Sequence, residues 1–222
     1  MKTTTRPRPC PSAFYNGQPV DLALCRQFGK TMHLGDLMYV HEVLALPEKV
    51  QPIRDWWVAG PFPSPTPGKL DFDMSTPVED AFAALGEGNV DLSAAYEASG
   101  RSVRWQKVQG DAEGVVDLDG PLGVVEWAAA YGYAEIESPR EQAVLFALGS
   151  DDSMKVWLNG RVVHVYPVGR TCLRKMNAAY FTTPLQDYVT LQLHAGVNRL
   201  LVRVNNFTMS WGFVVGTVKE QS

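Results

Sequence analysis

The sequence has little cysteine, and the spacing of that cysteine excludes several classes of fold. Cys10, Cys25 and Cys172 are the three cysteines in 222 residues, and none belongs to a CxxC pair. A zinc knot or a disulfide framework needs paired cysteines at short spacing, so neither is indicated. A chain of this length can also bury a hydrophobic core without a metal or a cross-link. Whether two of the three thiols form a bridge stays open.

Long apolar runs and clustered basic residues are missing as well. No stretch reaches the roughly 18 apolar residues of a membrane-spanning helix, so no membrane partner is expected. The first residues, MKTTTRPRPCPSAFYNG, are positively charged but lack the apolar core of a secretory signal, which leaves the localisation unknown. With a net charge of −4 and a pI near 5.6, the chain is not expected to bind nucleic acid, because such binding needs clustered Lys and Arg.

The signature motifs of common enzymes are absent from the sequence. The histidines have no HExxH spacing, and neither GxSxG nor a glycine-rich phosphate loop occurs. Glu135 and Glu137 keep a small glycan-degrading enzyme open as a remote alternative, since glycoside hydrolysis uses two carboxylates. Side chains two residues apart on a strand point the same way, however, rather than across a bound sugar. We therefore expect no catalytic residues.

Residues 1–50 show no clear periodicity and predict an irregular N-terminal extension. Prolines at positions 7, 9 and 11 forbid a helix at its start. The segment Asp55–Gly60 then reads as the first definite strand, which a proline-rich loop ends. After it, Thr76-Pro77-Val78-Glu79 has the residues of a helix start, with Pro77 at the first helical position and Glu79 completing a capping box.

From about residue 103 onward, one short strand follows another. Apolar residues alternate with other residues in Gln142–Leu148, Met154–Leu158 and Tyr188–Leu193. Asn159-Gly160 is a strong hairpin signal, because both central positions of a type I′ turn need positive φ. Nothing alternates strand with helix, which argues against a parallel α/β sheet. The residues thus predict an all-β domain over 51–222, an antiparallel β-sandwich with one or two short helices.

Four stretches carry a resemblance to a known module: DWWVAGPF (55–62), YAEIESP (133–139), LGSDDSMKVWLNG (148–160) and HAGVNRLLVRV (194–204). The chain from about residue 54 to 218 resembles the galactose-binding-like and protective-antigen-type β-sandwiches, which are often appended to bacterial glycoside hydrolases, polysaccharide lyases and adhesins. The resemblance implies a non-catalytic fold of the jelly-roll type that commonly binds carbohydrate. Its third stretch is more specific for the fold than for the function.

Within the protective-antigen-type lectins, Asp151 and Asp152 match the positions that hold a calcium ion, which in turn holds sugar hydroxyls. This chemistry is reasonable because a hard cation takes several oxygen ligands, and vicinal diols can complete its shell. Ser153 stands where glycine is usual, and no second acidic loop is identifiable that would supply the remaining ligands. The alternative for both aspartates is turn chemistry, in which Asp bonds its own backbone.

Further candidate glycan contacts lie on strands and loops around these aspartates. Trp157 is off the core face and is a candidate stacking platform for a pyranose ring. Arg170 lies in a basic loop suited to the carboxylate of a uronic acid. Asn205 and Asn206 end a strand and offer amides that both donate and accept, and the loop after them reaches Trp211. A purely structural role is the alternative for every one of these residues.

The sequence thus predicts a lectin-like, non-catalytic carbohydrate-binding module or accessory domain that recognises a glycan through its end loops. The glycan itself is not specified. The alternative is a structural or protein-interaction subunit that uses the sandwich as an assembly block, since a free-standing sugar module gains little unless it is tethered or multivalent. A homo-oligomer or a larger multidomain or multisubunit assembly stays open.

Overall fold

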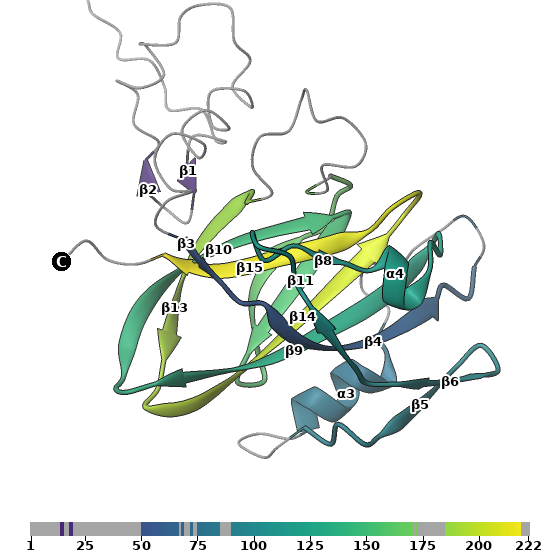
Figure 1. Cartoon of the computed structure of the whole chain (residues 1–222), viewed down its shortest axis with the longest axis horizontal. Helices are drawn as coiled ribbons and strands as arrows, with labels where there is room; N and C mark the ends of the chain where they lie inside the picture. Colours follow the sequence, from purple (N-terminus) through teal and green to yellow (C-terminus); the bar gives the residue numbers. More distant parts are fainter. Residues whose placement is uncertain are drawn as a thin grey trace, which may run out of the picture.

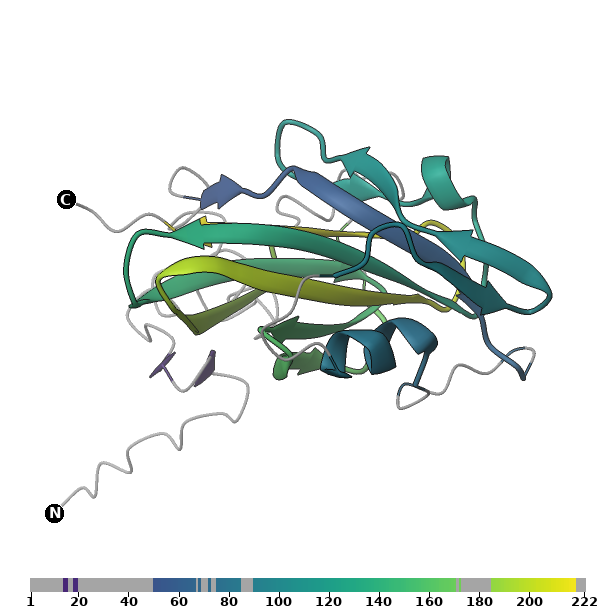
Figure 2. The same cartoon turned by 90° about the horizontal axis from the view of Figure 1, so that it is seen from below.

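The computed structural model of the chain describes residues 14–15, 18–19, 50–66, 68, 72, 75–84, 90–170, 172 and 185–218. Most strands in these segments form two antiparallel sheets stacked on each other (Figure 1, Figure 2). This confirms the all-β antiparallel sandwich, whereas its jelly-roll subtype stays a prediction. The predicted irregular extension lies mostly outside the described residues. In its described part, strands β1 (Phe14–Tyr15) and β2 (Gln18–Pro19) pair with each other.

The larger sheet has six strands in the order β12-β11-β14-β9-β4-β7, so β12 and β7 are its edges. The bounds of these strands are Arg161–Tyr166 (β12), Ser153–Leu158 (β11), Gly196–Asn206 (β14), Ala128–Ser138 (β9), Asp55–Pro63 (β4) and Gln106–Gln109 (β7). Asn159 and Gly160 join β11 to β12 with φ values of 50° and 78°. The hairpin predicted from these two residues is therefore confirmed.

The smaller sheet has five strands, in the order β13-β10-β15-β3 with β8 also paired to β15. Their bounds are Asp187–Leu193 (β13), Gln142–Asp151 (β10), Gly212–Val218 (β15), Val50–Pro52 (β3) and Val116–Asp117 (β8). The chain changes sheet between β10 and β11, and again between β13 and β14. The turns that make these crossings lie at opposite ends of the sandwich, because β10 and β13 are antiparallel neighbours.

The core lies between the two sheets and is built from alternate residues of their strands. Val156 of β11 lies beside Val202 of β14, and both belong to the same buried cluster as Leu148 and Phe213 of the smaller sheet. Burial of each such side chain contributes about 1.5–3 kcal/mol. Gly132 of β9 is required by this packing, since a Cβ there would lie 2.5 Å from Cζ of Phe213.

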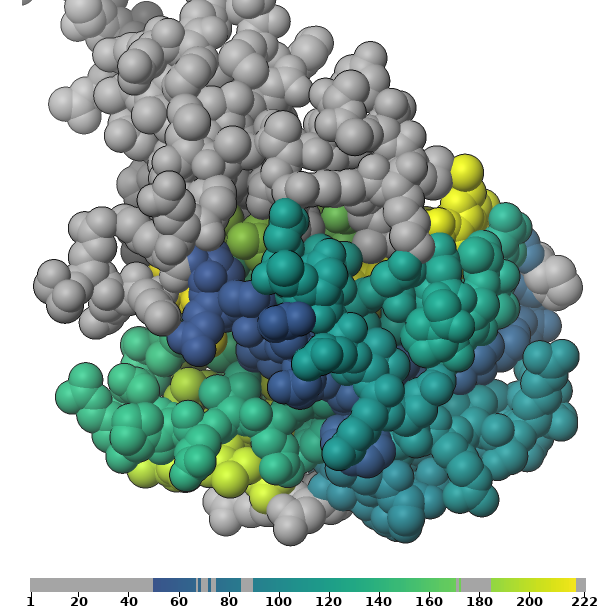
Figure 3. All heavy atoms as spheres, viewed as in Figure 1, coloured from purple at the N-terminus to yellow at the C-terminus, as the bar shows by residue number. Residues whose placement is uncertain are grey.

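A third layer covers the outer face of the six-stranded sheet. It consists of helix α3 (Pro77–Ala84) and the hairpin of β5 (Ala95–Ala98) with β6 (Arg101–Arg104), which lie together in Figure 1. Figure 3 shows one face of the molecule, on which β4, this hairpin and residues 105–122, which end in helix α4 (Asp119–Leu122), form one continuous surface. Apolar side chains of this layer and of the sheet make a second buried cluster.

The predicted helix start at Pro77 is confirmed, but the capping box is not formed. The Thr76 hydroxyl donates to Tyr131 Oη at 2.7 Å, and the Glu79 carboxylate accepts from Arg203 at 2.8 Å. Both side chains are therefore used to dock α3 on the sheet rather than to cap it. Among the described residues, no helix has the length and the apolar character needed to cross a membrane.

Candidate functional site

Most of the predicted site residues gather at one end of the sandwich. Asp151 ends β10, Asp152 follows it, and Asn206 ends β14. The Asp152 amide donates to the Asn205 carbonyl at 2.9 Å, and Arg170 Nε donates to the hydroxyl of Ser150 beside Asp151, which brings the loop after β12 to the same place. We call this region, around residues 150–153, 166–170 and 205–208, the aspartate end.

Asp152 is the more exposed residue of the predicted aspartate pair. Its Oδ2 accepts the backbone N–H of Phe207 at 2.7 Å. Burial raises the pKa of Asp152, and the N–H groups of Phe207 and Thr208 lower it without cancelling the rise. Asp151 is only 5% exposed, and the peptide bond between the two aspartates is cis. The pair thus presents one half-buried carboxylate rather than two open ones.

The two asparagines that end β14 are completely buried and differ in their partners. Asn205 accepts from Arg203 Nε at 2.8 Å and donates to the Ser153 hydroxyl at 2.9 Å, so both its Oδ1 and its Nδ2 have a partner. Asn206 donates through Nδ2 to two backbone carbonyls at 3.0 Å each. Its Oδ1 has no hydrogen-bond partner among the described residues. Asn206 Oδ1 is therefore an acceptor without a donor, in the strand that ends beside Asp152.

The oxygens of this end are the kind that a hard cation takes, but they form an incomplete set. No group of three or more His, Cys, Asp or Glu side chains in the described segments is placed to hold a metal ion. The Asp152 carboxylate and Asn206 Oδ1 suit calcium chemically, since calcium accepts carboxylate and amide oxygens together. Calcium at Asp151 and Asp152 therefore stays a prediction.

Arg170 lies at the aspartate end as predicted, but its guanidinium is already bound within the protein. Nη2 lies 2.7 Å from Oδ2 of Asp187, and the group stacks 3.8 Å above the ring of Tyr166. His164 approaches the same Asp187 oxygen at 2.9 Å. The predicted grip of Arg170 on a uronic acid is thus corrected to a tie between edge strands, because Asp187 neutralises its charge.

Neither predicted tryptophan offers an open ring face. Trp157 is on the outer face of the sheet as expected, yet it is 5% exposed within the cluster beneath the third layer, and Lys155 Nζ lies 4.9 Å from its ring centre. Trp211 is 0% exposed and donates through Nε1 to the Gly123 carbonyl at 2.9 Å. The structure gives both rings packing roles, which corrects the expectation that they contact a glycan.

The aspartate end has an aromatic pair that sequence reasoning missed. Trp127 and Phe207 stack with ring centres 6.0 Å apart and planes 25° apart, and both side chains are only partly buried. Phe207 is the residue whose N–H binds Asp152, so the carboxylate and the rings belong to one structure. The two aromatic residues precede β9 and follow β14, and no local pattern in the sequence links such distant loops.

No family model and no curated protein matches this sequence. Among solved structures, the chain is similar to a β-glucosidase from Kluyveromyces marxianus at 13% identity and a TM-score of 0.42, covering 75% of this chain and 17% of that one. It is also similar to a β-glucuronidase from an uncultured Clostridium species at 13% identity and a TM-score of 0.37, covering 77% and 29%.

A further similar structure is the A domain of a subtype-switched epithelial adhesin from Candida glabrata, solved in complex with β-lactose. Its identity is 11% and its TM-score 0.29, with 78% of this chain and 85% of that one covered. The chain corresponds to only a minor part of the two glycosidases. Likenesses as weak as these carry no argument about function.

Proposed function

We propose that this chain is a non-catalytic carbohydrate-binding domain that holds a glycan at the aspartate end. The observation that carries the proposal is the junction of a half-buried carboxylate with a stacked aromatic pair, where Phe207 donates to Asp152 and stacks on Trp127. Sugar sites combine these two elements, because hydroxyls need polar acceptors and the C–H face of the ring packs on an aromatic surface.

The position of the other carboxylates supports binding rather than hydrolysis. Glu135 and Glu137 are exposed near the end of β9, whereas Trp127 precedes its start. Glu135 accepts the hydroxyl of Tyr133 at 2.7 Å on the outer face of the sheet. Glu135 and Glu137, the two carboxylates that kept glycoside hydrolysis open, are therefore not part of the aspartate end.

Calcium belongs to this proposal as the ion that Asp152 and Asn206 would help to hold. The Asp152 carboxylate and the unpartnered Asn206 Oδ1 would each supply one oxygen. Bound calcium would supply a positive centre on which two vicinal sugar hydroxyls can complete the shell. Glycan binding in calcium should then exceed binding in a chelator.

A glycan array tests the proposed function, with the wild type applied in calcium and in chelator. The ligand found is then titrated against Phe207→Ala, Trp127→Ala and Asp152→Asn, each of which should weaken binding at least tenfold, or about 1.4 kcal/mol. Trp57→Ala is the matched aromatic control, since its ring is also half-buried but lies on β4 beneath Lys107. Absence of any glycan ligand, or equal losses in Trp57→Ala, would contradict the proposal.

A second candidate function is assembly through the free edge of the six-stranded sheet. Val162 and Val165 on β12 are 50% and 45% exposed. A bulge opposite Val156 and Trp157 sets both valines on the outer face, with Val162 beside Trp157 and Val165 beside Lys155. Exposed apolar edge strands pair readily with other chains. Light scattering should then report an oligomer that Val162→Lys with Val165→Lys converts to monomer, and a monomeric wild type would remove this candidate.

A further inference from the structure

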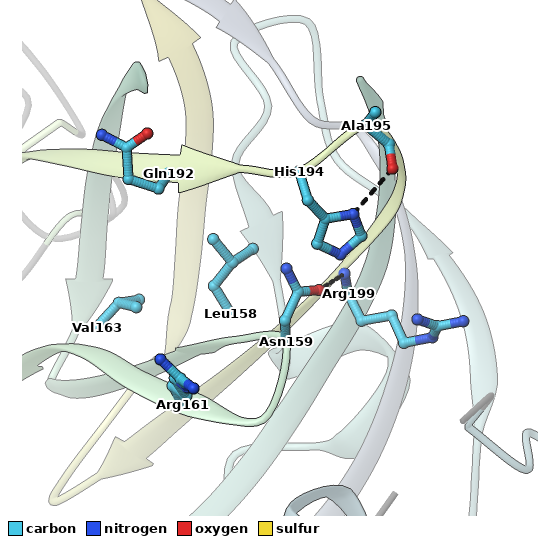
Figure 4. Close-up of a pocket in the computed structure, with 8 residues that line it drawn as sticks. All are labelled: Leu158, Asn159, Arg161, Val163, Gln192, His194, Ala195 and Arg199. Atoms are coloured by element: carbon cyan, nitrogen blue, oxygen red, sulfur yellow. Dashed lines mark hydrogen bonds between the residues drawn. The ribbon is translucent and has the colours of Figure 1, made fainter. Parts of the chain in front are cut away.

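A cavity of about 800 Å³ opens at the end of the sandwich opposite the aspartate end (Figure 4). It lies beside the turn that joins β11 to β12 and the turn that joins β13 to β14. Leu158 and Val163 supply its apolar part, and Arg161 and His194 supply polar groups, whereas the Gln192 amide points to the other side of β13 from Leu158 in Figure 4. The cavity plays no part in the proposed function, because none of its lining residues belongs to the aspartate end.

The rim of this cavity is cross-linked by the side-chain amides of Asn198 and Asn159. Asn198 is 0% exposed, and its Nδ2 donates to the carbonyls of His194 and Gly196 at 2.9 and 3.2 Å. Its Oδ1 accepts from the His194 amide at 3.1 Å and from Asn159 Nδ2 at 2.9 Å. Asn159 Oδ1 in turn accepts the Arg199 amide at 2.8 Å. Both turns are thereby fixed to each other, which lowers the ordering cost of binding a ligand between them.

The polar groups of the cavity are the Arg161 cation and the His194 imidazole. With the described residues, the Arg161 guanidinium forms no hydrogen bond or ion pair. His194 Nδ1 donates to the Ala195 carbonyl at 3.0 Å, which leaves Nε2 as an acceptor in the neutral ring. No acidic side chain is among the described lining residues, and Figure 4 shows the Arg199 guanidinium extending away from Leu158 and Val163.

We infer that this cavity binds a uronic acid unit, with its carboxylate on Arg161, a hydroxyl on His194, and its C–H face against Leu158 and Val163. A guanidinium binds a carboxylate in bidentate fashion. A hydroxyl can donate, so it satisfies the His194 acceptor, which a bare carboxylate cannot do.

An NMR titration of the full chain with sodium D-glucuronate tests this inference, with D-glucose and N-acetyl-L-glutamate as matched probes. Glucuronate should shift the signals of the two turns and bind roughly tenfold or more tightly than either matched probe. Arg161→Gln and, separately, His194→Phe should weaken glucuronate binding, while Arg101→Gln, which removes an exposed arginine from β6, should leave it unchanged.

Three results would overturn the inference. Equal binding of glucose would show that the charge is not recognised, and equal binding of N-acetylglutamate would show that the sugar is not. Unaltered glucuronate binding in Arg161→Gln would place the ligand elsewhere. Phe207→Ala should leave this titration unchanged, so that failure at this cavity and failure at the aspartate end are separate outcomes.

Discussion

Arg203 of β14 and Glu79 of α3 form an ion pair whose arginine is completely buried. Nη1 lies 2.8 Å from Oε1, and the Arg203 side chain is 0% exposed. The same carboxylate oxygen accepts the hydroxyl of Tyr131 at 2.7 Å, and Arg203 Nε donates to Asn205. This network ties the third layer to the centre of the six-stranded sheet and reaches the strand end that supports the aspartate end.

Replacement of Glu79 should therefore destabilise the whole domain. Glu79→Gln removes the carboxylate charge that faces the buried Arg203 guanidinium, and breaking such a pair costs about 3–5 kcal/mol. Urea denaturation measures the free energy of unfolding. Glu97→Gln is the control, because Glu97 is exposed on β5 and its replacement should change stability by less than about 0.5 kcal/mol. Equal effects of the two substitutions would contradict the role given to the pair.

Gly132 should not tolerate a side chain, although it lies in a strand. A Cβ there would lie 2.5 Å from the Phe213 ring, so Gly132→Ala should cost about 1–3 kcal/mol through overpacking. Gly120→Ala is the control, since nothing lies within 4 Å of a Cβ at that position. Thermal unfolding compares the two, and Phe213→Leu should restore part of the loss in Gly132→Ala. An unchanged melting temperature in Gly132→Ala would show that the sheets are spaced differently.

Asp187 should make the fold sensitive to acid. Burial raises the pKa of Asp187, but hydrogen bonds and charge from His164 and Arg170 outweigh it and hold the pKa below its ordinary value. Because the folded-state pKa is the lower one, ionised Asp187 stabilises the fold above about pH 4, and this contribution is lost as the pH falls through the folded-state pKa.

Asp187→Asn should consequently be less stable than the wild type near neutral pH, by about 1–3 kcal/mol. The difference should narrow below about pH 4, where the wild type loses the same contribution. Urea denaturation at a series of pH values measures it, with Asp55→Asn as the exposed control. A difference that stays constant down to about pH 3 would contradict the assignment.

Cys172 should be chemically inert in the folded protein. It is 1% exposed, and burial together with the Asp151 carboxylate raises the pKa of its thiol. Since the thiolate is the reactive form, iodoacetamide should modify Cys172 slowly in native buffer and rapidly in urea. Peptide mass spectrometry follows each cysteine separately. Native labelling at the rate of a free thiol such as glutathione would show that this position opens readily.

The sheet core could be predicted because it depends on local alternation. A few consecutive residues suffice to predict both the apolar stripe of Met154, Val156 and Leu158 and the turn at Asn159-Gly160. The third layer could not be predicted from the sequence. Arg203 alternates with apolar residues along β14, and this pattern predicts an exposed side chain, whereas α3 covers it in the structure. A structural role for Trp157 was the alternative from the sequence, but the layer that covers its ring could not be predicted for the same reason.

The candidate site was predictable in its place but not in its composition. The sequence predicted that Asp152 and Asn206 lie at the same end of the sandwich, because each follows or ends a strand and the turns of an antiparallel sandwich gather at its two ends. The engagement of Arg170 by Asp187 and the stacking of Trp127 on Phe207 depend on contacts between distant segments. A single sequence carries no signal for either contact.

The third layer also limits how a polysaccharide could approach. A long chain that runs across the strands needs an open, concave sheet face, and here α3 and the β5–β6 hairpin cover part of that face (Figure 2). In the proposed function the contact lies at one end of the sandwich, which suits branch tips or chain termini rather than the middle of a polymer. Strong attachment would then require several copies displayed side by side, each holding a different terminus.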